Sequence, residues 1–425
     1  MTAPATSPAE SPVARGGAVD PATGARVAVF GAMLATAGLP LYIHLPVYAG
    51  QVLGLPLATL GVVLMAMRLF DLAQDPFLGR LTDRLALSGA TLARLSALGL
   101  AAGFLMLFVA PMPGLAWLVA ALMLLFTAFS LATILLYGRG VAIGGGRHGQ
   151  LALAGWREAG IIAGIVLAAA LPDLLGRAVP GAGAWRVFGV VLAALCLVAL
   201  AVSRGLWSGP VAPAAPLTRA ALSRSGAGGL IALAFVNALP VAFTSTLFLF
   251  FVGDYLRLPG MAGVFLILFF VAAGLSAPLW SRLARRAGAR PTLIAGMALA
   301  VAAFVFAGVL QPGDAVAFAA ISAASGAALG ADMVILPALF SAALARAGLA
   351  PGLAFGLWSL AGKAALGLAA GVALPLLQIA GFEPGGDSPA RAMGALLILY
   401  AGLPCILKLG VILWVARHPL DGESA

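Results

Sequence analysis

The sequence predicts an all-α integral membrane protein whose twelve transmembrane helices form two halves of six. Three observations lead to this fold class: an extremely apolar composition, twelve apolar runs long enough to span a bilayer, and an internal repeat. Of the 425 residues, 63% are hydrophobic and only 9% are charged, and the mean hydropathy is +1.10. Soluble proteins carry about 25% charged residues. The composition therefore excludes a water-soluble globular protein.

The charge and the reactive side chains exclude further classes of protein. The net charge is +10, but the basic residues lie in short gaps between apolar runs, so we expect no nucleic-acid partner. Cys196 and Cys405 lie inside apolar runs, which predicts neither a disulfide framework nor a metal site. The three histidines are scattered, and no Ser/His/Asp group or phosphate loop accompanies them. We predict that the protein is not an enzyme and has no cofactor.

Twelve runs reach the roughly 20 apolar residues that a membrane-spanning helix needs. Residues 1–25 are rich in Ala, Pro and Ser and are predicted to form a disordered tail, and residues 417–425 form a second tail. The predicted spans are 26–49, 57–79, 91–110, 114–137, 151–172, 185–204, 228–252, 261–281, 291–310, 315–341, 352–380 and 392–416.

The basic residues predict the orientation. An even number of spans places both termini on one side, and the segments on that side hold sixteen Arg residues, against four on the other side and four basic residues within spans. Positive charge accumulates at the cytoplasmic face, so we expect cytoplasmic termini. The 22 Arg against 2 Lys, with abundant Ala and Gly, indicate a GC-rich bacterial genome and hence an inner membrane.

A linker and a repeat divide the spans. Residues 205–227 carry several prolines and are predicted to be a flexible cytoplasmic linker between halves 26–204 and 228–416. Four of the nine residues from Pro76 are identical to those from Pro278, 202 positions later, and Trp156 and Trp358 share this offset. Parallel six-helix halves are typical of major facilitator transporters.

Span 2 carries three charged residues on one helical face: Arg68, Asp71 and Asp75. A charge facing lipid at the centre of a span costs about 2.5–3.5 kcal/mol, so these side chains must face the protein interior. Two carboxylates with little water favour sharing a proton or binding a small cation, H⁺ or Na⁺. The alternative is a structural salt bridge with Arg68. The matching positions in the second half are Ala273 and Ala277, which favours a function for the acids.

Other polar residues within spans are candidates for solute binding, each with a structural alternative. Arg157 and Glu158 are adjacent and are expected on different faces of span 5. Lys363 in span 11 is expected to reach the centre or to pair with the two acids. Asp332 is expected to face the cavity with no base nearby, and Lys408 is expected to be peripheral. The remaining candidates are Trp156, Trp358, His44 and Asn237.

The R-x-x-D-x-x-x-D-P pattern at 68–76, preceded by Gly54-Leu-Pro-Leu-Ala-Thr-Leu-Gly61, resembles the glycoside-pentoside-hexuronide:cation symporter family, to which melibiose permease belongs. The resemblance implies that Asp71 and Asp75 bind the coupling cation, that Arg157 contacts a sugar and that Lys363 lies beside the cation site. This chain looks like a divergent member of that family, because spans 26–49 and 114–137 lack the acids of sugar-transporting members. An anionic or carboxylated solute is therefore at least as plausible as a neutral sugar.

The leading hypothesis is a monomeric secondary transporter that couples symport of a small polar solute to H⁺ or Na⁺ by alternating access. We favour the proton, because sodium usually requires more oxygen ligands than the acid pair supplies. One alternative is proton-coupled export of a drug-like or lipid molecule. Another is a membrane receptor or assembly protein that has lost transport. The expected partners are the solute and the lipid bilayer.

Overall fold

The computed structural model describes residues 19–38, 44–45, 48–49, 52–55, 57–84, 88–110, 114–179, 182–208, 214–386 and 388–418. Most of the predicted tails, residues 1–18 and 419–425, lie outside this part. The first helix begins at Pro21, where the Asp20 carboxylate accepts a hydrogen bond from the Thr23 N–H. The predicted tail of residues 1–25 is therefore too long, because this cap and Pro21 start the helix before the apolar run begins.

In the part of the first half that the structure describes, the chain forms six long helices. They are α1 (Pro21–Thr36), α3 (Leu57–Arg84), α4 (Gly89–Phe104) with a π-helical turn η1 (Leu105–Val109), α5 (Leu115–Gly144), α6 (Arg147–Ala178), and α7 (Ala182–Val202) with a 3₁₀ turn η2 (Ser203–Leu206).

The second half repeats this arrangement after a short helix in the linker, α8 (Arg219–Arg224). Its helices are α9 (Ala227–Phe250) with η3 (Phe251–Tyr255), α10 (Ala262–Ala287), α11 (Ala289–Val305) with η4 (Phe306–Val309), α12 (Ala315–Ala347), α13 (Pro351–Ile379), and α14 (Ala390–Leu397) continued by η5 (Ile398–Gly402) and α15 (Leu403–Arg417). Ten helical segments of the described chain, from α4 onward, are long and apolar enough to cross a membrane.

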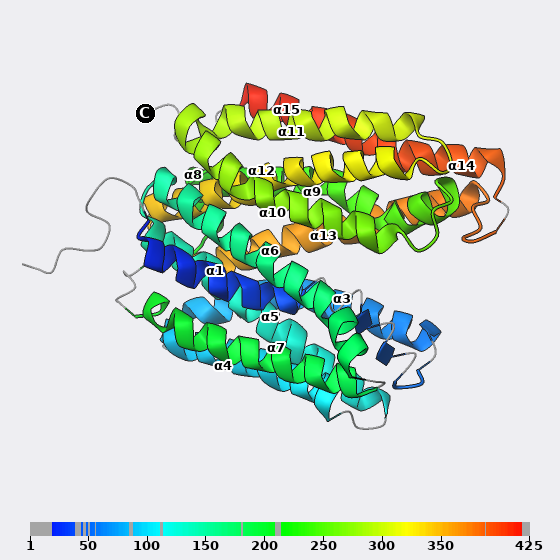
Figure 1. The fold of residues 1–425 in the computed structure, drawn as a ribbon. Helices are drawn as coiled ribbons and strands as arrows, with labels where there is room; N and C mark the ends of the chain where they lie inside the picture. The colour runs from blue at the N-terminus through cyan, green and yellow to red at the C-terminus, as the bar shows by residue number, and fades with distance from the viewer. Residues whose placement is uncertain are drawn as a thin grey trace, which may run out of the picture.

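The helices pack as two bundles that meet along α3, α6, α10, α12 and α13 (Figure 1). Large apolar residues from α1, α4, α5 and α7 form one core, and residues from α9 to α14 form another. α1 begins and α15 ends at the same end of the molecule, which we call the terminal end.

Backbone hydrogen bonds hold the described part of the predicted linker at Ala215. Ala215 pairs with the α12–α13 connection, where its N–H donates to the Gly348 carbonyl at 2.8 Å and its carbonyl accepts from the Ala350 N–H at 2.9 Å. The composition predicted flexibility, but backbone hydrogen bonds to the second half fix residues 214–216 in place.

Helix α3 shows how the sequence directs charge away from lipid. Val62, Met65 and Leu69 are 62–71% exposed on one side of the helix, and 100° per residue places Asp71 and Asp75 on the opposite side. Both aspartates are buried. The expected inward orientation of the two acids is confirmed.

Candidate transport site

Glycines bring α3 and α13 into close contact. A Cβ atom on Gly356 of α13 would lie 2.5 Å from the Asp75 carbonyl oxygen, and one on Gly79 of α3 would lie 2.3 Å from the Gly352 carbonyl oxygen. Only residues without side chains permit such a crossing. Because Lys363 follows Gly356 by two helical turns, the crossing places its ammonium against the inner face of α3.

Lys363 forms ion pairs with both aspartates of α3. Its Nζ lies 2.7 Å from Asp71 Oδ1 and 2.6 Å from Asp75 Oδ2. The Asp71 and Asp75 side chains are 5% and 0% exposed, and that of Lys363 is 18% exposed. One cation from the second half is thus shared by two carboxylates from the first half. This cluster of three residues is called the coupling triad below.

The two aspartates have different surroundings. Asp71 Oδ1 also accepts hydrogen bonds from Gln74 Nε2 at 2.8 Å and from Ser130 Oγ at 3.1 Å. Within the described structure, Asp75 has only the ion pair with Lys363. Arg68, predicted to join this group, lies on α3, but its side chain is outside the described part of the structure. Asp75 therefore depends on Lys363 far more than Asp71 does.

A cavity of about 480 Å³ lies between the halves, lined by α5, α6, α9, α12 and α13. Lys363 forms part of its wall, so the coupling triad is in contact with the space where a solute would bind. The other polar and aromatic residues of the wall are Phe129, Thr133, Tyr137, Glu158, Asn237, Asp332, Phe355, Trp358 and Ser359.

Arg157 and Glu158 form a buried ion pair, although adjacent residues were expected on different faces. Arg157 Nε and Nη2 each lie 2.9 Å from Glu158 Oε1, and the guanidinium stacks on the Tyr137 ring at 3.9 Å. Arg157 Nη2 also donates to the Met333 carbonyl at 3.3 Å. Glu158 lines the cavity, whereas Arg157 borders a small separate pocket. The flexible Arg side chain bends back to its neighbour because both charges are buried.

A second buried ion pair joins three helices of the second half. Lys408 Nζ on α15 lies 2.5 Å from Asp332 Oδ2 on α12 and donates to Asn237 Oδ1 on α9 at 2.7 Å. Lys408 was expected to be peripheral, and Asp332 was expected to have no base nearby; both expectations are wrong. Lys408 is 4% exposed, because the cost that turns Asp71 away from lipid applies equally to a lysine within a span.

The sequence matches the family described as MFS/sugar transport protein over residues 25–422. The chain belongs to this family. MFS denotes the major facilitator superfamily, so the predicted fold class is confirmed, and the chain is a multi-pass membrane protein with the fold of secondary transporters. No curated protein sequence matches it significantly.

Solved MFS transporters share this fold at low sequence identity. A bacterial homologue of the iron transporter ferroportin in an outward-facing state has 14% identity and a TM-score of 0.65, covering 93% of this chain and 100% of that one. The E. coli fucose:proton symporter FucP has 15% identity and a TM-score of 0.66, with coverage of 91% and 98%. The proton:xylose symporter XylE has 12% identity and a TM-score of 0.64, with coverage of 92% and 95%.

Three of the predicted solute-binding residues of this MFS chain do not line the cavity: Arg157, which borders the separate pocket, Trp156 and His44. Trp156 is 39% exposed and packs so tightly on α1 that a Cβ on Gly24 would lie 2.5 Å from its ring. His44 lies among aromatic rings, 6.2 Å from Trp185 and 6.1 Å from Phe188 between ring centroids. In contrast, Trp358 lines the cavity and stacks on Phe340. Trp156 does not line the cavity because α6 turns Glu158, two residues later and on the opposite side of the helix, toward the centre.

Contacts at the terminal end hold the two halves of the transporter together. The Asp83 carboxylate accepts hydrogen bonds from the N–H groups of Gly352 and Leu353, at 2.8 and 2.7 Å, at the start of α13. Ser281 Oγ on α10 donates to the Leu151 carbonyl on α6 at 2.7 Å. Desolvation raises the pKa of the Asp83 carboxyl above its ordinary value, more than the two N–H donors lower it. The cavity is thus closed on its terminal side.

Proposed function

We propose that this transporter is a cation-coupled symporter of a small polar solute and that the coupling triad binds the coupling cation. The observation that carries the proposal is the single Lys363 ammonium shared by two buried carboxylates from the opposite half. The triad has two negative carboxylates and one positive ammonium, so its net charge is −1. One bound cation balances this charge, and a buried uncompensated charge is expensive.

The proton is the favoured coupling ion. The Lys363 ammonium occupies the space between the two carboxylates, and Asp71 Oδ1 already accepts bonds from Gln74 and Ser130. Sodium would have to displace the ammonium and gather further oxygen ligands. A proton needs only one carboxylate oxygen, and Asp75 offers one that no described residue occupies.

Alternating access gives the triad its mechanism. Lys363 moves with the second half, and the aspartates move with the first. When the terminal end opens, α13 separates from α3 and the ion pairs break. A bound cation then replaces Lys363 as the counter-charge. Opening therefore costs little free energy only when the cation is bound. With the termini in the cytoplasm, as the distribution of arginines predicts, the closed terminal side corresponds to an outward-facing state.

Charge balance favours an uncharged solute over the anion that the sequence left open. Among the described side chains that line the cavity or pair with its wall, and with every acid including Asp332 in its ionised form, acids outnumber bases by one, and a single coupling cation cancels the difference. An anionic solute would leave the cavity with excess charge. The groups counted are Asp71, Asp75, Glu158 and Asp332 against Arg157, Lys363 and Lys408.

The solute site we propose combines an aromatic face with hydroxyl and amide groups. Trp358 supplies an aromatic face, and Thr133, Asn237 and Ser359 supply polar atoms. This combination suits a solute with several hydroxyl groups, such as a sugar or glycoside. Symport of fucose and xylose with protons by structural neighbours, and the resemblance to the glycoside-pentoside-hexuronide:cation symporters, support the same choice.

Uptake into liposomes tests the proposal. The purified protein, an Asp71→Asn/Asp75→Asn variant and an Asp314→Asn control are reconstituted and supplied with radiolabelled monosaccharides, glycosides and uronic acids under a proton or a sodium gradient. Asp314 is a suitable control because it lies in a loop, where it accepts a hydrogen bond from the Gln311 N–H. We expect proton-driven accumulation of an uncharged sugar by the wild type and the control only.

Two results would contradict the proposal. If the double variant accumulates solute as well as the wild type, the coupling triad is structural. If solute leaves preloaded vesicles against its gradient when protons enter, the protein is an exporter. Accumulation driven only by sodium would overturn the choice of ion and leave the rest intact.

A further inference from the structure

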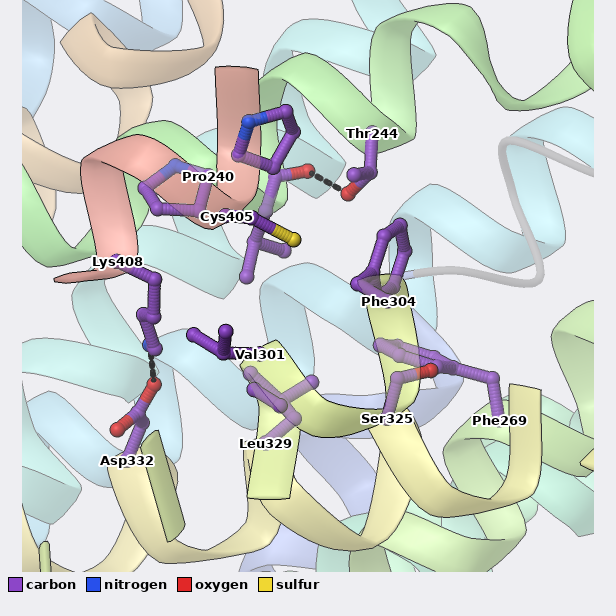
Figure 2. Close-up of a pocket in the computed structure, with 13 residues that line it drawn as sticks. Pro240, Thr244, Phe269, Val301, Phe304, Ser325, Leu329, Asp332, Cys405 and Lys408 are labelled. Atoms are coloured by element: carbon purple, nitrogen blue, oxygen red, sulfur yellow. Dashed lines mark hydrogen bonds and ion pairs between the residues drawn. The ribbon is translucent and has the colours of Figure 1, made fainter. Parts of the chain in front are cut away.

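The ion pair of Asp332 and Lys408 lies within the second half, apart from the coupling triad. Figure 2 shows the carboxylate and the ammonium facing each other at one end of a small pocket between α9, α11, α12 and α15. Lys408 Nζ lies 2.5 Å from Asp332 Oδ2 and 2.7 Å from Asn237 Oδ1. Asp332, Lys408 and Asn237 are 8%, 4% and 5% exposed. We call these three residues the second cluster.

The Asp332 carboxylate is satisfied on one side only. Its Oδ2 pairs with Lys408, whereas its Oδ1 is fully buried and has no hydrogen-bond partner among the described residues. An ionised carboxylate can accept about four hydrogen bonds. Oδ1 is therefore the oxygen of this carboxylate that no described group occupies and that is left free to form an O–H bond.

Protons have access to Asp332 from the cavity. Asp332 lines both the cavity of about 480 Å³ and the small pocket in Figure 2. Asp71 and Asp75 do not line the cavity as described; Lys363 does, and it lies against both of them. Asp332 thus borders the cavity without Lys363 between them, although its Oδ1 atom is itself buried.

Lys408 keeps a partner when Asp332 becomes neutral. Asn237 Oδ1 accepts a hydrogen bond from the ammonium at 2.7 Å, and an amide oxygen does not titrate. The cluster can therefore bind a proton while the buried ammonium keeps a hydrogen-bond acceptor.

The other charged groups near Asp332 are already paired or distant. From α6, Arg157 pairs with Glu158 and stacks on Tyr137 of α5. On the opposite wall of the cavity, Lys363 of α13 pairs with the two aspartates of α3. Helix α9 carries no charged residue. The remaining charges on the elements packed against α12 lie toward the ends of the helices: Arg139 on α5, Arg147, Asp173 and Arg177 on α6, Arg282, Arg285 and Arg286 on α10, Arg290 on α11, Arg346 on α12 itself and Arg417 on α15.

We propose that Asp332 is a second proton-binding site of this transporter, separate from the coupling triad. A hydrated proton from the cavity forms an O–H bond at Oδ1 and releases its water. The Lys408 ammonium retains its own protons, so the cluster gains one positive charge. No other bond forms or breaks.

Counting protons tests this inference without knowledge of the solute. Purified protein in nanodiscs is acidified stepwise with a pH-indicator dye, and the protons taken up per molecule are compared for the wild type, Asp332→Asn and the Asp314→Asn control. Infrared difference spectra follow the carbonyl stretch of buried protonated carboxylic acids in the same samples. We expect Asp332→Asn to lose one buried proton and its band, and we expect the Asp71→Asn/Asp75→Asn variant to retain both.

Several outcomes would overturn the inference. Asp332→Asn could take up as many protons as the wild type and keep the infrared band. Glu158→Gln could instead remove that band, which would assign the proton to the other acid of the cavity wall. Asp332→Glu covers the case in which the Asn variant does not fold: a shifted band supports the site, and an unchanged band refutes it. The measurement involves no solute, so it tests the proton site on Asp332 even if the symport proposal fails.

Discussion

A single methyl group on Gly356 should disturb the contact that supports the coupling triad. In Gly356→Ala the new Cβ would lie 2.5 Å from the Asp75 carbonyl oxygen and 3.0 Å from Pro76 Cα. Ordinary contacts begin near 3.4 Å, so α3 and α13 must separate by about 0.5–0.9 Å to admit it. Backbone atoms cannot rotate away as a flexible side chain can, so the strain falls on the crossing.

The magnitude follows from comparing this variant with a matched control. Overpacking of a close contact costs about 1–3 kcal/mol. Replacing a helical Gly by Ala returns up to about 1 kcal/mol of helix propensity. Gly367→Ala, on the same helix with nothing within 4 Å of the new Cβ, receives only the second contribution. The difference between the two variants should therefore be about 1–3 kcal/mol in favour of Gly367→Ala.

Thermal unfolding of the purified variants, together with uptake into liposomes, measures this difference. We expect Gly356→Ala to unfold at a lower temperature than Gly367→Ala and to transport more slowly, because longer distances from Lys363 to Asp71 and Asp75 weaken the triad. Equal melting temperatures for the two variants would refute the conclusion that glycine-mediated contact positions Lys363.

Three further predictions concern side chains whose surroundings the structure defines. Lys363→Met should destabilise the protein by about 3–5 kcal/mol, because it leaves two buried carboxylates without a counter-charge; adding Asp71→Asn and Asp75→Asn should restore much of the loss in a chemical-denaturation assay. Trp156→Ala should leave solute affinity in a binding assay within about twofold of the wild type, since the ring lies outside the cavity; a tenfold loss would contradict this placement. Asp83→Ala should remove the acceptor of two N–H groups at the start of α13, costing about 0.5–2 kcal/mol, and should increase labelling of cysteines introduced in the cavity from the terminal side; unchanged labelling would show that this contact does not close the cavity.

The apolar pattern was sufficient to predict the fold, because each crossing of a bilayer leaves a run of about 20 apolar residues. It placed the end of the first helix too late, because α1 ends at Thr36 and the predicted span was 26–49. It underestimated the lengths of several other helices. Helix α6 covers Arg147–Ala178, whereas the predicted span was 151–172, and α12 continues to Ala347 beyond the predicted end at 341. Hydropathy reports the part of a helix inside hydrocarbon, and hydrogen bonding within the helix carries it further into the aqueous layers.

The candidate site was predictable where one helix determined it and unpredictable where packing did. The inward orientation of Asp71 and Asp75 followed from one helical face. The pairing of Asp332 with Lys408 requires α12 and α15 to be neighbours, which no local pattern shows. The internal repeat was also misleading for Trp156, because equivalent positions in two halves meet different neighbours: Trp358 lines the cavity, and Trp156 packs on α1.

The two buried Asp–Lys clusters differ in how they respond to alternating access, and this difference gives them separate roles. The coupling triad joins the two halves, so opening the terminal end breaks it. Without a bound cation, opening would then cost about 3–5 kcal/mol, because buried charges lose their counter-charge. That cost corresponds to a population ratio of roughly 10²–10⁴, large enough to prevent opening without the coupling ion. Asp332 and Lys408 lie within one half and move together, so rocking of the halves leaves their ion pair intact. On the proposed mechanism, a proton on Asp332 is therefore carried through the whole cycle, whereas the charge on the triad determines whether the cycle proceeds.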